Sequence, residues 1–148
     1  MEPFIDATPG FGLANLPWGV FRLDTDPSPR PRIGVALGDC VVDVGVLDAA
    51  GLFPGKLLGG TGAHRRGIAD RDARGGSCMA SDNLNALMAL GPPAWAEARV
   101  TLQRLLSRGE GVLRDDRELR AAALLPRERV TMMMPAEIGD YTDFYVSE

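Results

Sequence analysis

The sequence predicts an α+β domain in which a small antiparallel sheet comes first and helices follow. Apolar residues alternate with other residues within 18–22, 32–37 and 40–44, which is the period of β-strands. Between residues 84 and 124, apolar residues recur every three or four positions, as on one face of a helix. Eighteen glycines and eleven prolines among 148 residues indicate short elements and many turns. A hydrophobic content of 45% is sufficient for one core.

The predicted sheet contains a hairpin and one further strand. Residues 18–22 are expected to form the first strand, with Trp18 and Val20 on one face. A proline-rich connection follows, and then residues 32–37 alternate as a second strand. Gly38 and Asp39 form a two-residue turn, after which residues 40–44 return as the partner strand. Such a sheet is too small to stand alone and fits a compact barrel.

Glycines set the limits of the next stretches. Gly34, inside the second strand, indicates either a bulge or close packing. Residues 46–50 are expected to form a short helix that stops at Gly51. Residues 59–80 combine many glycines and arginines with little that can be buried, so we expect a mobile surface loop there.

Three helices are then expected. The first runs from Ser81 or Asp82 as N-cap to Leu90. The second covers residues 92–108, because prolines suit a first turn and Gly109 ends the helix. Its predicted buried face consists of Trp95, Ala98, Leu102, Leu105 and Leu106.

The third helix leads towards the C-terminal part of the chain. Asp115 is its expected N-cap, with Glu118 as the capping-box partner, and Pro126 follows its end. Residues 130–134 are expected to be a strand or an extended segment. The run Met132-Met133-Met134 is interpreted as core packing and not as a soft-metal site.

Composition and charge exclude several functions. Sixteen basic and twenty acidic residues give a net charge of −4, which argues against a nucleic-acid footprint. The sequence lacks an apolar run near the ~18 residues that cross a bilayer, and its start lacks a signal-peptide pattern. Cys40 and Cys78 are expected to be reduced thiols, so a cytoplasmic location is predicted.

Four other motifs are set aside as sites. Residues 59–62 resemble a phosphate loop, but neither a preceding strand nor a following Lys-Ser/Thr pair is present. His64, the sole histidine, is expected to be solvated. Ser77 and Cys78 have no histidine nearby in sequence to activate a nucleophile. A solvated face is expected for the arginines that alternate with acids, at positions 114, 117, 120, 127 and 129.

The remaining candidate site is the acidic and aromatic motif near the C-terminus. Asp140 and Asp143 are three residues apart, so a helix would place them on one face and a strand on opposite faces. A carboxylate beside aromatic rings suits a hard cation or an oxygen-rich anionic substrate. The alternative is a loop with an Asx turn and rings buried at a domain edge. The motif contains three rings, Tyr141, Phe144 and Tyr145.

The run PAEIGDYTDFY, residues 135–145, resembles the start of the catalytic domain in the fumarylacetoacetase family. Further similar patches stand upstream in the same order, at residues 15–21 (NLPWGVF), 32–39 (RIGVALGD), 87–91, 95–99 and 113–116. The resemblance covers nearly the whole chain apart from the loop 59–80. NLPWGVF and DYTDFY are its most specific parts.

This resemblance implies a fold and an activity. Residues 1–134 would form a small SH3-like β-barrel with accessory helices, and residues 135–148 would be the first segment of a truncated, β-rich catalytic domain. The family hydrolyses a carbon–carbon bond of fumarylacetoacetate, giving fumarate and acetoacetate in tyrosine and phenylalanine catabolism. The parent protein would be a homodimer.

The resemblance also implies roles for two residues. Asp143 would donate a carboxylate to Ca²⁺ or Mg²⁺, and the Tyr145 hydroxyl would contact the substrate. The family's base histidine and its other metal ligands would lie beyond Glu148, so we expect no catalytic residue within this chain and no activity from it alone.

Two alternatives stay open. The chain could be a non-catalytic SH3-like binding or assembly module, or part of a related hydrolase that takes a different diketo acid. The reading frame beyond Glu148 discriminates between enzyme and module. A continuation with a histidine and further acidic ligands supports the enzyme.

Overall fold

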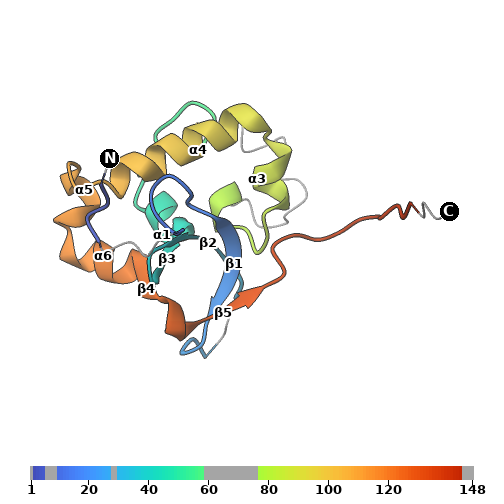
Figure 1. Cartoon of the computed structure of the whole chain (residues 1–148), viewed down its shortest axis with the longest axis horizontal. Helices are drawn as coiled ribbons and strands as arrows, with labels where there is room; N and C mark the ends of the chain where they lie inside the picture. Colours follow the sequence, from blue (N-terminus) through green and yellow to red (C-terminus); the bar gives the residue numbers. More distant parts are fainter. Residues whose placement is uncertain (1, 6–9, 28–29, 59–76, 145–148) are drawn as a thin grey trace.

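The structure, a computed structural model, describes residues 2–5, 10–27, 30–58 and 77–144. It is an α+β fold, as predicted: a five-stranded antiparallel sheet curls into a half-barrel, with helices packed against it (Figure 1). The strand order is β4-β3-β2-β1-β5, so that the last strand in sequence lies beside the first.

The predicted hairpin and the strand beside it are confirmed. Strands β1 (Trp18–Leu23), β2 (Arg32–Leu37) and β3 (Cys40–Asp43) are antiparallel neighbours. Leu37 pairs with Cys40 across the two-residue turn, in which Gly38 has a φ of 56°. Val20 is buried and Trp18 is partly buried against the same core, so the predicted face of β1 is also confirmed.

The helix α1 (Val44–Ala49) begins two residues earlier than predicted. The side chain of Asp43 accepts a hydrogen bond of 3.1 Å from the Val46 amide and caps the helix. The prediction that Val44 belongs to the hairpin is therefore wrong, because this cap starts the helix directly after β3. Gly51 ends the turn after the helix with a φ of 74°.

Part of the predicted loop 59–80 is ordered core. Residues 59–76, including His64, lie outside the described residues. Cys78–Ala80 form a 3₁₀ helix that is capped by the Ser77 hydroxyl, and Met79 is 1% exposed within the main core. The prediction of a surface loop is wrong for these residues because Met79 supplies an apolar anchor.

The next two helices are shorter than predicted. Helix α3 (Asn85–Ala89) lacks a side-chain cap, so the prediction of Ser81 or Asp82 as its N-cap is wrong. Helix α4 (Pro92–Leu105) buries four side chains, those of Ala94, Ala98, Leu102 and Leu105.

Trp95 does not belong to the buried face of α4, contrary to prediction. Its side chain is 42% exposed, and its indole N–H donates to the Leu87 carbonyl of α3 at 2.9 Å. This hydrogen bond holds the ring in the angle between the two helices and away from the core.

The helix predicted at 115–124 corresponds to α6 (Arg117–Ala123), and a short helix that was not predicted, α5 (Gly111–Arg114), precedes it. The N-cap of α6 is Asp116 and not Asp115, because Asp116 accepts the Leu119 amide at 2.9 Å while Asp115 pairs with Arg114. The chain then extends as β4 (Leu124–Pro126), a strand that was not predicted, and pairs with β3.

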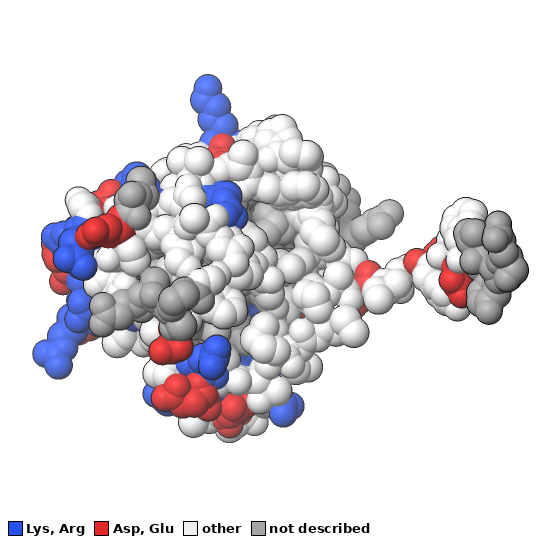
Figure 2. All heavy atoms as spheres, in the orientation of Figure 1, with Lys and Arg blue, Asp and Glu red and all other residues white. Residues whose placement is uncertain are grey.

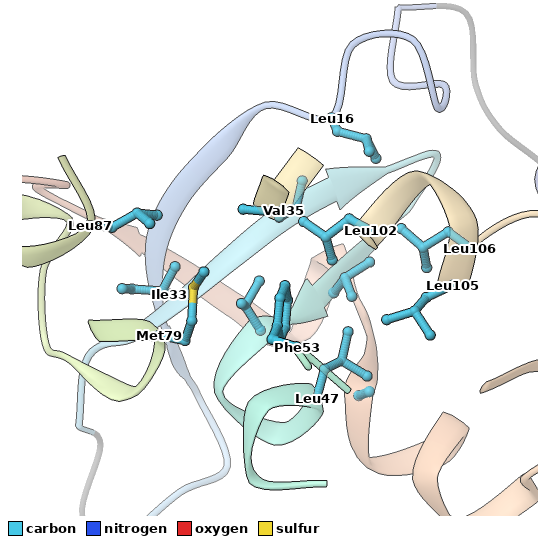
Figure 3. Packing of buried hydrophobic residues seen from close by; sticks show 14 of the residues in the cluster. Leu16, Ile33, Val35, Leu47, Phe53, Met79, Leu87, Leu102, Leu105 and Leu106 are labelled. Atoms are coloured by element: carbon cyan, nitrogen blue, oxygen red, sulfur yellow. The ribbon is translucent and has the colours of Figure 1, made fainter. Parts of the chain in front are cut away.

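The main core lies between one face of the sheet and the helices (Figure 3). Labelled side chains from β2, α1 and α4 meet there, including Ile33, Val35, Leu47 and Leu102. None of the described helices is long and apolar enough to cross a membrane.

A smaller cluster lies on the other face of the sheet and contains Phe21, Val41 and Leu125. A Cβ at Gly34 would be 2.7 Å from the Phe21 ring and 2.7 Å from a Val41 methyl carbon. The close-packing alternative for Gly34 is therefore confirmed, since the glycine leaves room for this ring.

The last strand, β5 (Val130–Met133), forms an edge of the sheet by pairing with β1. Met132 is 60% exposed and Met134 is 71% exposed. The prediction that this methionine run packs in the core is therefore wrong, because these side chains belong to neither hydrophobic cluster.

Candidate functional site

The acidic and aromatic motif forms an extended, exposed segment. After β5 the chain leaves the sheet and runs away from the domain as the long C-terminal stretch in Figure 1. Residues 137–144 have no regular secondary structure, so Asp140 and Asp143 do not share a helical face. Tyr141 and Phe144 are each 85% exposed, and the alternative of rings buried at a domain edge does not hold for them. Tyr145 lies outside the described residues.

Helix α3 fixes the base of this segment. The Leu84 amide donates to the Pro135 carbonyl at 2.8 Å. The Asn85 side chain donates to the Glu137 carbonyl at 2.9 Å and accepts from the Glu137 amide at 3.0 Å. Asp143 therefore lies six residues beyond a point at which the backbone is held by three hydrogen bonds.

Asp143 is an exposed carboxylate that could serve as one ligand of a hard cation. Among the residues the structure describes, no group of three or more His, Cys, Asp or Glu side chains could hold a metal ion. Because Ca²⁺ and Mg²⁺ need about six or more oxygen ligands, the described residues do not fit a complete metal site.

A partly buried ionic cluster joins β2 to the start of α1, and the sequence analysis missed it. Arg32 contacts Asp43 at 3.2 Å and Asp26 at 3.0 Å. Burial raises the pKa of Asp43 above its ordinary value, although hydrogen bonds from the Val46 amide and Arg32 act in the opposite direction. An aspartate between a strand and a helical pattern was the available signal, since such residues are common N-caps.

The cluster lines a depression of about 320 Å³. Arg32 contacts both Asp26 and Asp43, so it ties β2 to the start of α1. Cys40 is a half-buried free thiol. Burial, with a further contribution from Asp39 and Glu128, raises the pKa of its thiol and so disfavours the nucleophilic thiolate.

A second hollow, here called the tryptophan hollow, lies beside the base of the C-terminal segment. It has a volume of about 470 Å³ and is lined by Trp18, Leu84, Leu87, Met88, Trp95, Ala96 and Arg99. The sequence analysis missed it because the apolar period placed Trp95 in the core. The hollow forms only when α3, α4 and β1 come together.

The structure thus defines a small α+β half-barrel domain with an exposed acidic and aromatic extension. The family model described as "Fumarylacetoacetase N-terminal" matches residues 14–135, and the chain belongs to this family. The resemblance stated from the sequence is therefore confirmed.

Curated relatives extend the match over nearly the whole chain. Fumarylacetoacetase from Oryza sativa subsp. japonica is 39% identical over 99% of this chain, and that from Arabidopsis thaliana is 42% identical over 99%. Fumarylacetoacetase from Homo sapiens is 44% identical over 93%. The matches cover 32%, 31% and 28% of these relatives, so the chain spans less than a third of their length.

Proposed function

We propose that this chain is the N-terminal part of a metal-dependent hydrolase that converts fumarylacetoacetate to fumarate and acetoacetate in tyrosine and phenylalanine catabolism. The observation that carries the proposal is the family match over residues 14–135. The identities of 39–45% to curated fumarylacetoacetases over 93–99% of this chain support it.

We further propose that the chain divides at residues 134 and 135. Residues 1–134 would form an SH3-like barrel with accessory helices, and residues 135–148 would begin a β-rich catalytic domain. Two observations support this division. Strand β5 ends at Met133, and the family model ends at residue 135. The curled five-stranded half-barrel supports the SH3-like class.

Within the extension, we propose Asp143 as one oxygen ligand of Ca²⁺ or Mg²⁺ and Tyr145 as a contact for the substrate. The exposure of Asp143 supports its role, because an exposed carboxylate is accessible to further ligands. The base histidine and the remaining ligands would come from the part of the polypeptide that follows. Because the described residues do not complete the site, we assign no catalytic step to them.

The parent protein is proposed to be a cytoplasmic homodimer that associates through its catalytic domain. Its partner is proposed to be the small-molecule substrate, not a nucleic acid or a membrane. The net charge of −4 supports this choice, since a nucleic-acid site needs a basic surface.

The test is a fumarylacetoacetate turnover assay with and without Ca²⁺ or Mg²⁺. It compares the 148-residue chain with the longer polypeptide encoded by the same gene. We expect metal-dependent hydrolysis from the longer polypeptide only. Asp143→Asn should lower kcat/KM by at least about 100-fold, in the range typical of lost metal-site groups.

Asp140→Asn is the matched control, because this neighbouring carboxylate has no assigned role. Hydrolysis by the 148-residue chain would contradict the expectation that this chain alone is inactive. An inactive longer polypeptide would instead favour the non-catalytic binding or assembly module.

A further inference from the structure

We propose that the tryptophan hollow is the docking site for the catalytic part of the same polypeptide, which inserts an apolar side chain between Trp18 and Trp95. This inference rests on the proposed function and deepens it. It assigns a surface of the N-terminal domain that positions the catalytic part, and Asp143 with it.

The first argument is the exposure of large apolar groups. Trp95 is 42% exposed and Met88 is 45% exposed, while Leu84 and Leu87 are buried at 9% and 5%. The hollow thus has an apolar floor and exposed apolar side chains above it. A concave apolar site with exposed tryptophan is typical of the centre of a protein interface.

The second argument is the chemistry of the polar groups at the hollow. The Trp95 indole N–H already donates to the Leu87 carbonyl. The Arg99 guanidinium donates to the carbonyls of Ala14 and Asn15. An occupant therefore gains most from apolar contact, which favours an aliphatic or aromatic anchor over a charged ligand.

The distribution of charge agrees with this choice. Figure 2 shows that charged side chains gather over α5, α6 and the lower end of the sheet. The visible surface between α4 and the base of the C-terminal segment is mostly uncharged. An apolar partner can approach this region without desolvating many charges.

The third argument is position. Leu84 both lines the hollow and holds the Pro135 carbonyl, and its neighbour Asn85 holds Glu137. The polypeptide that continues from Glu137 therefore starts at the edge of the hollow. Tethering of this kind gives the continuing chain a high effective concentration, of the order of millimolar for short linkers.

The fourth argument is the amount of chain available. The relatives are matched over only 28–32% of their length, so a body larger than this domain follows the matched region in each of them. That body is the occupant to which the proposal commits. A second copy of this chain and the chain's own residues 138–144 are the competing occupants.

Hydroxyl-radical footprinting with mass spectrometry tests the proposal. It compares the 148-residue chain with the longer polypeptide from the same gene, and turnover is measured on the same preparations. We expect the oxidation rates of Met88 and Trp95 to fall at least about fivefold in the longer polypeptide. Val112 on α5, at the other end of α4 in Figure 1, is 48% exposed and should react equally in both.

A charge in the hollow provides the matched variant. Met88→Glu in the longer polypeptide should restore Trp95 oxidation to the rate in the 148-residue chain, because burial of a carboxylate opposes docking. Ala89→Glu, at the neighbouring exposed position of α3, should leave Trp95 protected. Neither change should lower the Tm of the 148-residue chain.

Equal oxidation of Met88 and Trp95 in the two polypeptides would overturn the proposal, and turnover would then show whether the proposed function survives. Protection without turnover would sustain docking and contradict the function. Protection of Met88 and Trp95 from oxidation already in the 148-residue chain would also overturn the proposal. Protection that increases with protein concentration would then identify a second copy as the occupant. Protection that is lost on removal of residues 138–148 would identify the chain's own segment.

Discussion

At the scale of single residues, two glycines of the sheet differ in what a side chain would meet. Alanine at Gly34 would press on the Phe21 ring and Val41, which cannot move freely in the buried cluster. Gly34→Ala is therefore expected to lower the free energy of unfolding by about 1–3 kcal/mol, measured by urea unfolding.

Gly19→Ala is the matched control for this substitution. Its Cβ would meet only the terminal methyl of Met132 at 2.8 Å, and that side chain is 60% exposed and free to turn away. We expect little change in the urea midpoint. Equal losses at the two positions would contradict the account of packing around Phe21.

The burial of the Asp43 carboxyl is expected to make the stability of the fold depend on pH. Burial raises its pKa in the folded state, so the folded chain binds more protons than the unfolded chain between pH 3.8 and the raised pKa. The contribution of Asp43 to stability is thus present below pH 3.8 and is lost as pH rises through that window. Asp43→Asn keeps an acceptor for the Val46 amide and removes this titration.

The stability of the unaltered chain relative to Asp43→Asn should therefore fall as pH rises through the same window. Urea unfolding at a series of pH values measures the difference, and Asp140→Asn serves as an exposed control. If the unaltered chain instead gained stability relative to Asp43→Asn as pH rises, the ion pair with Arg32 would outweigh the burial of Asp43.

Residue-level predictions from the sequence succeeded where the cause is local. The two-residue turn at Gly38 follows from what glycine permits, whereas the sequence left a bulge and close packing open at Gly34, because the packing there comes from Phe21 and Val41 on neighbouring strands. The exposure of Trp95 was not predictable in this way. It depends on a hydrogen bond to Leu87 across the angle between two helices, which the period of one helix does not encode.

At the scale of elements, the start of α6 can be tested directly. Asp116 accepts the Leu119 amide, whereas Asp115 makes an ion pair with its exposed neighbour Arg114. Asp116→Ala is expected to lower the free energy of unfolding by about 1 kcal/mol, the usual cost of losing an N-cap. Asp115→Ala should leave the thermal midpoint unchanged. A larger loss of stability for Asp115→Ala than for Asp116→Ala would instead identify Asp115 as the N-cap, as expected from the sequence.

The elements themselves were predictable in proportion to how local their contacts are. The hairpin β2–β3 joins neighbouring residues, and its strands carry a clear alternation. Strand β4 has three residues and exists because Leu125 pairs with Val41, far away in sequence. The pairing of β5 with β1 also joins residues that are far apart in sequence.

At the scale of the whole molecule, the roles of Asp143 and Tyr145 are proposals that rest on the resemblance alone. The spacing of Asp140 and Asp143 allowed a shared helical face, opposite strand faces or a loop. The structure shows an extended exposed segment, and the carboxylates among the described residues do not gather into a group that could hold a metal ion. A site completed by residues far along a polypeptide has no complete signature within one part of it.

The whole domain is expected to be stable without its extension. Ile138, Tyr141 and Phe144 are 73–85% exposed, so the segment that carries them buries little apolar surface against the domain. Removal of residues 138–148 should therefore leave the urea midpoint unchanged and should reduce self-association, measured by light scattering. The comparison chain ends at Arg129 and also lacks β5, which pairs with β1 over four residues.

The chain that ends at Arg129 should be largely unfolded, because loss of β5 exposes the edge of β1 beside the buried Phe21 cluster. A lower urea midpoint after removal of residues 138–148 alone would show that the segment packs on the domain. An unchanged midpoint would mean that the apolar groups of the segment are still available for packing elsewhere. That availability is required if Asp143 is to join ligands supplied by the rest of the polypeptide.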